Sequence, residues 1–120
     1  MMPTTQPFDV HVRRQPRAAI IELHGEINAA AEARLNEAYG QAEQDAPELI
    51  LLNFERVGYI NSTGIALMVG LLARAHKHKR RLVACGLSPH YREIFEITRL
   101  VDYMPVFSDE ATALTERIGA

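Results

Sequence analysis

The chain has 120 residues, enough for one domain with a single hydrophobic core but too few for two. Its 15 acidic and 13 basic residues leave a formal charge of −2, so the composition gives no reason to expect nucleic acid as a partner. One cysteine, Cys85, excludes an internal disulfide and, with no secretion signal and no apolar run of about 20 residues, predicts a cytoplasmic protein without membrane insertion.

Residues 1–7 are expected to form a flexible lead-in, and residues 8–118 a single domain. Apolar and polar side chains alternate over residues 8–13, with the period of a half-exposed strand. A more apolar strand is predicted over residues 18–23, after a proline that interrupts the first. The short connection between these two strands predicts an antiparallel pair.

Asn28 is a suitable N-cap for the next element, a predicted helix that runs to about residue 44. Apolar residues recur there at helical spacing, which indicates one buried face. That face consists of Ala31, Leu35, Ala38 and Ala42. The uninterrupted apolar run at residues 49–52 then predicts a strand that is covered on both faces.

The segment around the polar turn 61–64 is the most informative in the chain. An apolar stretch stops at this turn, and a helical pattern follows at once and continues to about residue 78. Ser62 and Thr63 therefore place two hydroxyls at the start of a helix, where backbone N–H groups lack partners and the helix dipole is positive. Such a place tolerates a bound or covalently attached phosphate.

This helix is expected to bury one stripe of side chains, made of Ile65, Met68, Leu72 and Ala75. Leu67 and Leu71 extend beyond the stripe and are candidates for an exposed partner surface. Gly70 costs about 1 kcal/mol against alanine in mid-helix unless it allows close packing, which is the role we expect for it. The basic run 76–81 is interpreted as cations that complement the helix C-terminus, since its two histidines do not share a helix face.

A second buried strand is predicted at residues 82–85, followed by a helix that starts at Ser88, ahead of a proline, and ends near Leu100. Residues 104–107 are expected to form a short edge strand, because the proline within them cannot donate to a ladder. Ser108 is the expected cap of a final helix. The inner face of that helix would consist of Ala111, Leu114 and Ile118.

The resulting element order, β-β-α-β-α-β-α-β-α, is typical of an α/β fold. It predicts a single domain built on a mostly parallel sheet of four to five strands, with an antiparallel first strand and about four helices. We expect the helices to flank the sheet in one compact sandwich.

Two motifs resemble those of a known family. LHGEIN at residues 23–28 is similar to the family's G-E-[IL]-D turn, and NFERVGYINSTG at residues 53–64 is similar to its D-L-x-x-[VL]-x-[FY]-[IM]-D-S-[ST]-G signature, in register throughout. The elements expected over residues 82–114 also follow the family's ending. On these features the chain resembles the STAS-domain anti-sigma factor antagonists, or anti-anti-sigma factors, which implies a STAS-type domain.

The resemblance implies a regulatory protein that is not an enzyme and uses no cofactor or metal. In the family, the unphosphorylated protein binds an anti-sigma factor that is also a GHKL-type serine kinase, and this binding frees the sigma factor. The kinase phosphorylates the serine before the [ST]-G pair, here Ser62, and a PP2C-type phosphatase removes the phosphate. The residues expected to bind the partner are Asn28, Asn61, Ser62, Thr63, Gly64 and Leu67.

The chain departs from the family's motifs at three positions, always in the same way. Asn28, Asn53 and Asn61 stand where the family usually has aspartate. Each asparagine keeps the shape and hydrogen-bonding reach of aspartate but removes a charge that would repel a phosphate. The fold is expected to be unaffected, whereas recognition by a cognate kinase, and with it phosphorylation of Ser62, is left open.

Other interpretations also remain open at the level of sequence. Ser62 and Thr63 can serve simply as helix caps. His24 either lines the binding face or has a structural role. Cys85 is expected to be a small buried hydrophobe. The alternatives for the whole chain are a STAS subunit of an ABC-type lipid transport complex, a scaffold STAS protein that is not phosphorylated, and a nucleotide-binding domain.

Overall fold

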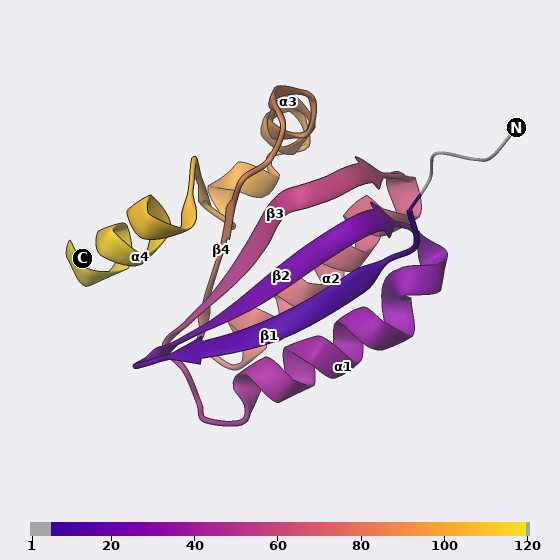
Figure 1. The fold of residues 1–120 in the computed structure, drawn as a ribbon. Helices are drawn as coiled ribbons and strands as arrows, with labels where there is room; N and C mark the ends of the chain where they lie inside the picture. The colour runs from indigo at the N-terminus through magenta and orange to yellow at the C-terminus, as the bar shows by residue number, and fades with distance from the viewer. Residues whose placement is uncertain (1–5, 120) are drawn as a thin grey trace, which may run out of the picture.

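The computed structural model describes residues 6–119 and the side chains of residues 6–115, so most of the expected lead-in lies outside the described residues. Figure 1 shows the elements in chain order. They are β1 (Asp9–Gln15), β2 (Ala18–Ile27), the short 3-10 helix η1 (Ala29–Ala31), α1 (Glu32–Glu43), β3 (Leu49–Ile60), α2 (Ser62–Lys77), β4 (Arg81–Cys85), α3 (Pro89–Ile97), the short 3-10 helix η2 (Leu100–Asp102), β5 (Val106–Phe107) and α4 (Glu110–Gly119).

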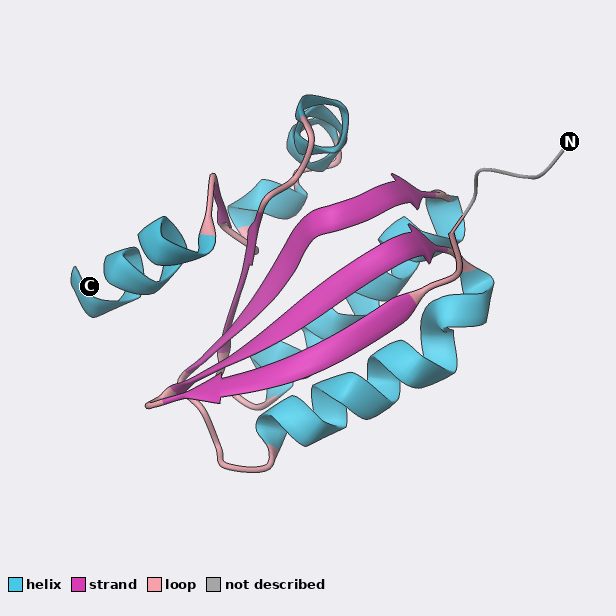
Figure 2. Ribbon diagram, viewed as in Figure 1, coloured by secondary structure: helices cyan, strands magenta, loops and turns pink. Residues whose placement is uncertain are grey.

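The five strands form one sheet in the order β1-β2-β3-β4-β5, with β1 antiparallel to β2 and all other neighbours parallel. This confirms the predicted fold class and the antiparallel first strand. Helices α1 and α2 cover one face of the sheet, and α4 packs against the other (Figures 1 and 2). Connections between parallel strands of one sheet are right-handed, so the helices that join successive strands lie on the same face of the sheet. Helix α4 follows the last strand and is therefore free to pack against the opposite face.

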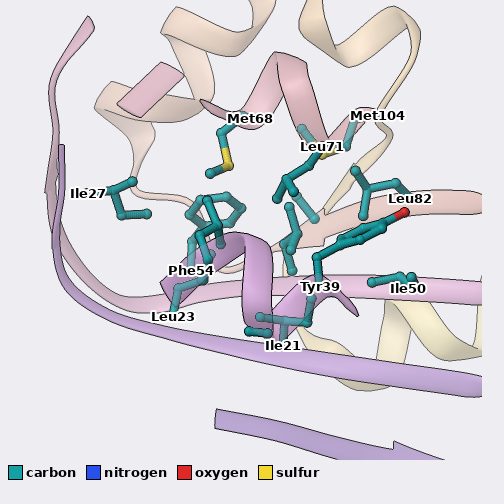
Figure 3. Packing of buried hydrophobic residues seen from close by; sticks show 14 of the residues in the cluster. Ile21, Leu23, Ile27, Tyr39, Ile50, Phe54, Met68, Leu71, Leu82 and Met104 are labelled. Carbon is teal, nitrogen blue, oxygen red and sulfur yellow. The ribbon is translucent and has the colours of Figure 1, made fainter. Parts of the chain in front are cut away.

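The larger core lies between the sheet and helices α1 to α3 (Figure 3). Tyr39 of α1, Phe54 of β3 and Met68 of α2 are each at most 2% exposed. Phe54 meets Phe95 of α3 edge to face, with the ring centroids 6.0 Å apart. The smaller core on the opposite face contains Ala18, Ile20, Leu49, Leu51, Val83, Cys85 and Ala113. Successive strand residues thus enter different cores, which is why these strands are continuously apolar.

Two strands extend further than the sequence predicted. β2 continues to Ile27, and the turn expected around Gly25 is a shift of register within the strand. Gly25 has a φ of +83°, and a Cβ there would lie 2.2 Å from the carbonyl oxygen of Pro7, so only glycine fits. β3 continues to Ile60 through the charged residues 55–56. Both of those side chains are exposed to solvent, so the strand can include them without burying a charge.

The buried stripe of α2 is rotated from the predicted one. Leu71 is 2% exposed and belongs to the core, whereas Ile65 and Leu72 are only half-buried. Gly64 lies against the end of β2 and so fixes the orientation of the helix about its axis. The residues that then face the core are Met68, Leu71 and Ala75. The packing role predicted for Gly70 is wrong, because nothing lies within 4 Å of the place where its Cβ would be.

The cap of α4 also differs from the prediction. Asp109, not Ser108, caps the helix, because its Oδ1 accepts a hydrogen bond at 2.8 Å from the backbone N–H three residues later. The helix places Ala113 in the smaller core, with Leu114 packed against that core. Of the residues predicted for the inner face, Ala111 is exposed, Leu114 is half-buried, and Ile118 lies outside the described side chains.

Candidate functional site

The two sequence motifs meet at one edge of the sheet. Ile27 ends β2, Ile60 ends β3, and the two residues pair in register on neighbouring parallel strands. Asn28 and Asn61, which follow them, therefore leave the sheet at the same edge. The backbone N–H of Asn61 donates a hydrogen bond to the carbonyl oxygen of Ile27 at 3.2 Å, which ties the second turn to the first.

Both asparagines act as N-caps through the side-chain oxygen, which was predicted for Asn28. Oδ1 of Asn61 accepts a hydrogen bond from the backbone N–H of Gly64 at 2.8 Å, at the start of α2. Oδ1 of Asn28 accepts one from the backbone N–H of Ala30 at 2.9 Å, at the start of η1. An amide oxygen meets this need as a carboxylate oxygen would, so both substitutions keep the geometry of the turn.

Gly64 sets the separation between α2 and the edge of the sheet. It is buried, and a Cβ at this position would lie 2.3 Å from the carbonyl oxygen of Ile27 and 2.7 Å from Cγ2 of Ile60. A larger residue would force α2 away from both strands. The glycine is therefore a position of close approach, and it holds the neighbouring hydroxyls at the edge of the sheet.

The hydroxyls of Ser62 and Thr63 are not used by the fold. These residues occupy the first two positions of the 16-residue helix α2, and both side chains are exposed. Within residues 6–119 neither hydroxyl takes part in a hydrogen bond. Asn61 fills the capping role that the sequence left open for them, and the first turn of α2 contains no acidic side chain. The helix N-terminus can therefore accommodate an anion beside either hydroxyl.

The other candidates for a partner surface differ in exposure. Leu67 lies further along α2, where it is half-buried and packs against the larger core. Leu71 is buried, so the suggestion that it contributes to an exposed surface is wrong. Of the six residues expected to bind the partner, Ser62 and Thr63 are exposed, Asn28, Asn61 and Leu67 are half-buried, and Gly64 is buried.

Tyr91 supports the turn in a way that the sequence did not reveal. β4 pairs with β3 only as far as Asn53, so the last part of β3 has no strand on that side. There the hydroxyl oxygen of Tyr91, on α3, accepts a hydrogen bond from the backbone N–H of Ile60 at 2.9 Å, in a buried position. No local pattern links residues 31 positions apart, so only the folded chain identifies this contact.

Asn53 lies away from the turn, although it belongs to the same motif as Ser62. Its Nδ2 donates a hydrogen bond at 2.7 Å to Oε2 of Glu110, on α4, and its Oδ1 accepts one at 2.8 Å from the backbone N–H of Glu55. An aspartate here would place two carboxylates against each other. The missing charge at this position thus accommodates Glu110, a contact that the sequence did not reveal.

Arg13 connects β1 to this contact. Its Nε donates a hydrogen bond to Oε2 of Glu22 at 2.6 Å, and its guanidinium also donates to Glu110. Burial alone raises the pKa of the Glu22 carboxyl, but the hydrogen bond and charge of Arg13 outweigh it, with help from His24, so this pKa lies below its ordinary value. The two carboxylates therefore share one guanidinium that remains protonated.

His24 faces a hollow on this side of the sheet. A cavity of about 420 Å³ lies between the sheet and the start of α4, and its lining includes Glu22, His24, Asn53, Glu55 and Glu110. The imidazole of His24 packs edge to face against that of His11, with the centroids 5.2 Å apart. His24 thus lies on the face opposite α1 and α2.

No helix in the described part of the chain is both long and apolar enough to cross a membrane. Within the same residues no group of three or more histidine, cysteine, aspartate or glutamate side chains is placed to hold a metal ion.

Sequence relatives share nearly the whole of this domain. Residues 9–113 match the family model described as the STAS domain. A protein named anti-sigma-B factor antagonist, from Staphylococcus aureus, is 31% identical over 99 residues, which cover 82% of this chain and 92% of that protein.

Solved structures share the fold. An anti-sigma factor antagonist from Mycobacterium paratuberculosis superposes with a TM-score of 0.79 at 19% identity, covering 92% of this chain and 93% of the other. The Bacillus cell fate determinant SpoIIAA, solved in its phosphorylated form, superposes with a TM-score of 0.69 at 22% identity, covering 93% of this chain and 99% of the other. At these identities the likeness is one of fold.

Proposed function

The chain belongs to the STAS-domain family of anti-sigma factor antagonists, and from this premise we propose that it controls a sigma factor by reversible partner binding. The unphosphorylated form binds an anti-sigma factor that is also a GHKL-type serine kinase, and so releases the sigma factor. Phosphorylation of Ser62 by that kinase ends the binding, and a PP2C-type phosphatase restores it.

The observation that carries this proposal is the state of the Ser62 hydroxyl. It is exposed at the first position of α2 and unused by the fold, while Asn61 caps the helix in its place. A kinase can therefore modify Ser62 without removing a contact that stabilises the domain. Thr63 is exposed as well, and the choice of Ser62 is supported by its place directly before Thr63 and Gly64 in the family motif.

A phosphate at this position would act on the interface and leave the fold intact. It adds roughly 1.5 to 2 negative charges and three strong acceptors, which the unpaired N–H groups and the positive dipole of the helix start accommodate. A partner that covers Ser62 must desolvate this dianion or meet it with its own charges. A loss of about 3 kcal/mol, more than a hundredfold in affinity, is enough for a switch.

The acceptor is tested by incubating the purified chain with its cognate kinase, ATP and Mg²⁺ and measuring the intact mass. We expect a gain of about 80 Da, one phosphate, in the wild type and in Thr63→Ala. Ser62→Ala should show no gain. A gain that persists in Ser62→Ala would assign the phosphate to another residue.

The switch is tested by isothermal titration of the anti-sigma partner with two matched variants. Ser62→Asp introduces a charge, and Ser62→Asn introduces a neutral side chain of nearly the same shape. We expect Ser62→Asp to bind at least about tenfold more weakly and Ser62→Asn to bind nearly as tightly as the wild type. Equal affinities for the two variants would contradict exclusion by charge, and a specific complex with an ABC-type ATPase would favour the transport alternative.

A further inference from the structure

Helix α2 has a second, largely apolar stripe that the fold covers only in part. Val69, Leu72, Ala73 and His76 follow one another at the i, i+3, i+4, i+7 spacing of a single helix face. The buried stripe of α2 lies on a different face. Val69 is 49% exposed.

This second stripe forms one wall of a groove. The groove has a volume of about 510 Å³, and its lining also includes Leu82 of β4 and Tyr103 and Pro105 in the segment between η2 and β5. Tyr103 is 73% exposed. Two largely exposed apolar side chains, Val69 and Tyr103, thus line a hollow of the size that binding sites commonly have.

One end of the groove is strongly cationic. It is lined by Arg80 and Arg81, which belong to the basic run 76–81. Within the described residues, Glu43 is the only acid that pairs with this run: its carboxylate lies 3.0 Å from Nδ1 of His78 and 3.4 Å from Nε of Arg80. Glu43 also pairs with Arg74 of α2, so it cannot neutralise the whole cluster.

The helix dipole accounts for only part of this charge. His76 and Lys77 lie in the last turn of α2, as the interpretation of this run expected, whereas Lys79 to Arg81 come after the end of the helix. The single carboxylate in the groove, that of Asp102, is held by Nε of Arg99 at 2.7 Å. The groove is therefore apolar and locally cationic, although the net charge of the whole chain is −2.

We propose that this groove binds an amphipathic helix of a partner protein, with acidic residues beside its apolar stripe. The exposed face of α2 offers side chains at the spacing into which a second helix packs, and the segment around Tyr103 also lines the groove. Carboxylates of the incoming helix meet Arg81 and the neighbouring lysines, which gives the contact its orientation and its selectivity.

The groove acts separately from Ser62. Val69 lies seven residues after Ser62 and His76 fourteen, which corresponds to about 10 and 21 Å along the helix axis. Both separations exceed the Debye length of about 8 Å at physiological salt. Binding in the groove is thus compatible with either state of Ser62, and the proposal does not depend on the phosphorylation switch.

The test uses the full chain and a fluorescent synthetic helix of roughly 18 residues with leucines on one face and glutamates on its flanks. Anisotropy titration at physiological salt should show saturable binding, and the same peptide with lysines for glutamates should bind at least about tenfold more weakly. Val69→Ser and Arg81→Glu should each weaken binding by at least about tenfold. Both sites are exposed, so these variants should fold, which circular dichroism checks.

Two control variants isolate the groove. Arg92→Glu makes the same change of charge as Arg81→Glu at an exposed site on α3 and should leave the affinity unchanged. Ser62→Asp should also leave it unchanged, even if the phosphorylation switch proves wrong. Backbone amide shifts in the titrated protein should move at Val69, Ala73 and Tyr103.

Several outcomes would overturn the proposal. Equal binding of the acidic and basic peptides would remove the electrostatic basis, and equal binding by Arg81→Glu and the wild type would place the peptide elsewhere. Absence of binding up to about 1 mM peptide would leave less affinity than a docking site needs. If the chain self-associates and Val69→Ser abolishes this, the groove binds a second copy of the chain instead. If the chain floats with phosphatidylglycerol vesicles and Arg81→Glu abolishes this, the groove binds a membrane instead.

Discussion

The hydroxyl oxygen of Tyr91 accepts a hydrogen bond from the backbone N–H of Ile60, one residue before the turn that contains Ser62. Successive N–H groups of a strand point to opposite sides. That of Asn61 reaches Ile27 on β2, so that of Ile60 faces the side where β4 has already ended. A side chain from α3 thus completes the hydrogen bonding of the strand end that positions the candidate site.

Tyr91→Phe should lower the free energy of unfolding by about 1–3 kcal/mol, because it leaves a buried N–H group without an acceptor. Urea unfolding measures this loss, and hydrogen exchange should show faster exchange of the Ile60 amide. Tyr103→Phe is the matched control, since Tyr103 is 73% exposed and its hydroxyl has no hydrogen-bond partner among the described residues. Equal effects of the two substitutions would mean that the Tyr91 contact contributes nothing.

Asn61→Ala should destabilise the domain by about 1 kcal/mol, because the Gly64 N–H loses its acceptor at the start of α2. Asn61→Asp should retain the cap and gain a few tenths of a kcal/mol from the helix dipole. Asn36→Ala, at an exposed position inside α1, should instead raise stability slightly, since alanine is the better helix former. Thermal unfolding of the three variants checks the order, which a similar loss in Asn36→Ala would contradict.

Two glycines of α2 should respond in opposite directions to the same substitution. Gly64→Ala should lower stability by about 1–3 kcal/mol, because its Cβ would lie 2.3 Å from the Ile27 carbonyl oxygen. Gly70→Ala should raise stability by up to about 1 kcal/mol, because it improves helix propensity where nothing lies within 4 Å. Denaturant unfolding of both variants provides the measurement. Destabilisation by Gly70→Ala would show that this position has a packing role after all.

The stability of the domain should depend on pH through Glu22. Burial raises the pKa of this carboxyl, but Arg13 and His24 outweigh that effect and bring it below its ordinary 4.5. A lowered pKa in the folded state contributes stability that is present above pH 4.5 and is lost as the pH falls through the folded value. Glu22→Gln should therefore flatten the loss of stability on acidification. Urea unfolding at a series of pH values tests this, and curves of wild type and variant that stay parallel would contradict it.

Local patterns were sufficient to predict the order of the strands and α-helices and two of the caps. Strand alternation, helical spacing and the capping roles of Asn28 and Ser88 all depend on residues within a few positions of one another. The same holds for the place of Ser62 at a helix start. These parts of the fold and of the candidate site follow directly from the order of the residues.

Contacts between distant segments could not be predicted in this way. Helix α2 has two apolar stripes, and the close approach of Gly64 to Ile27 at the end of β2 decides which of them is buried. The support of the turn by Tyr91 spans 31 positions. Both are properties of the packed chain, and periodicity alone treats the alternatives as equal.

The hydrogen bond between Asn53 and Glu110 joins residues 57 positions apart, and its chemistry allows only certain pairs of side chains. An aspartate at position 53 would oppose the glutamate at 110, so a chain with the more usual aspartate needs a neutral or basic residue at the second position. The two positions are thus expected to covary among homologues. Restoring the family's aspartate in this protein would require a second substitution in α4, such as Glu110→Gln, to avoid the electrostatic conflict.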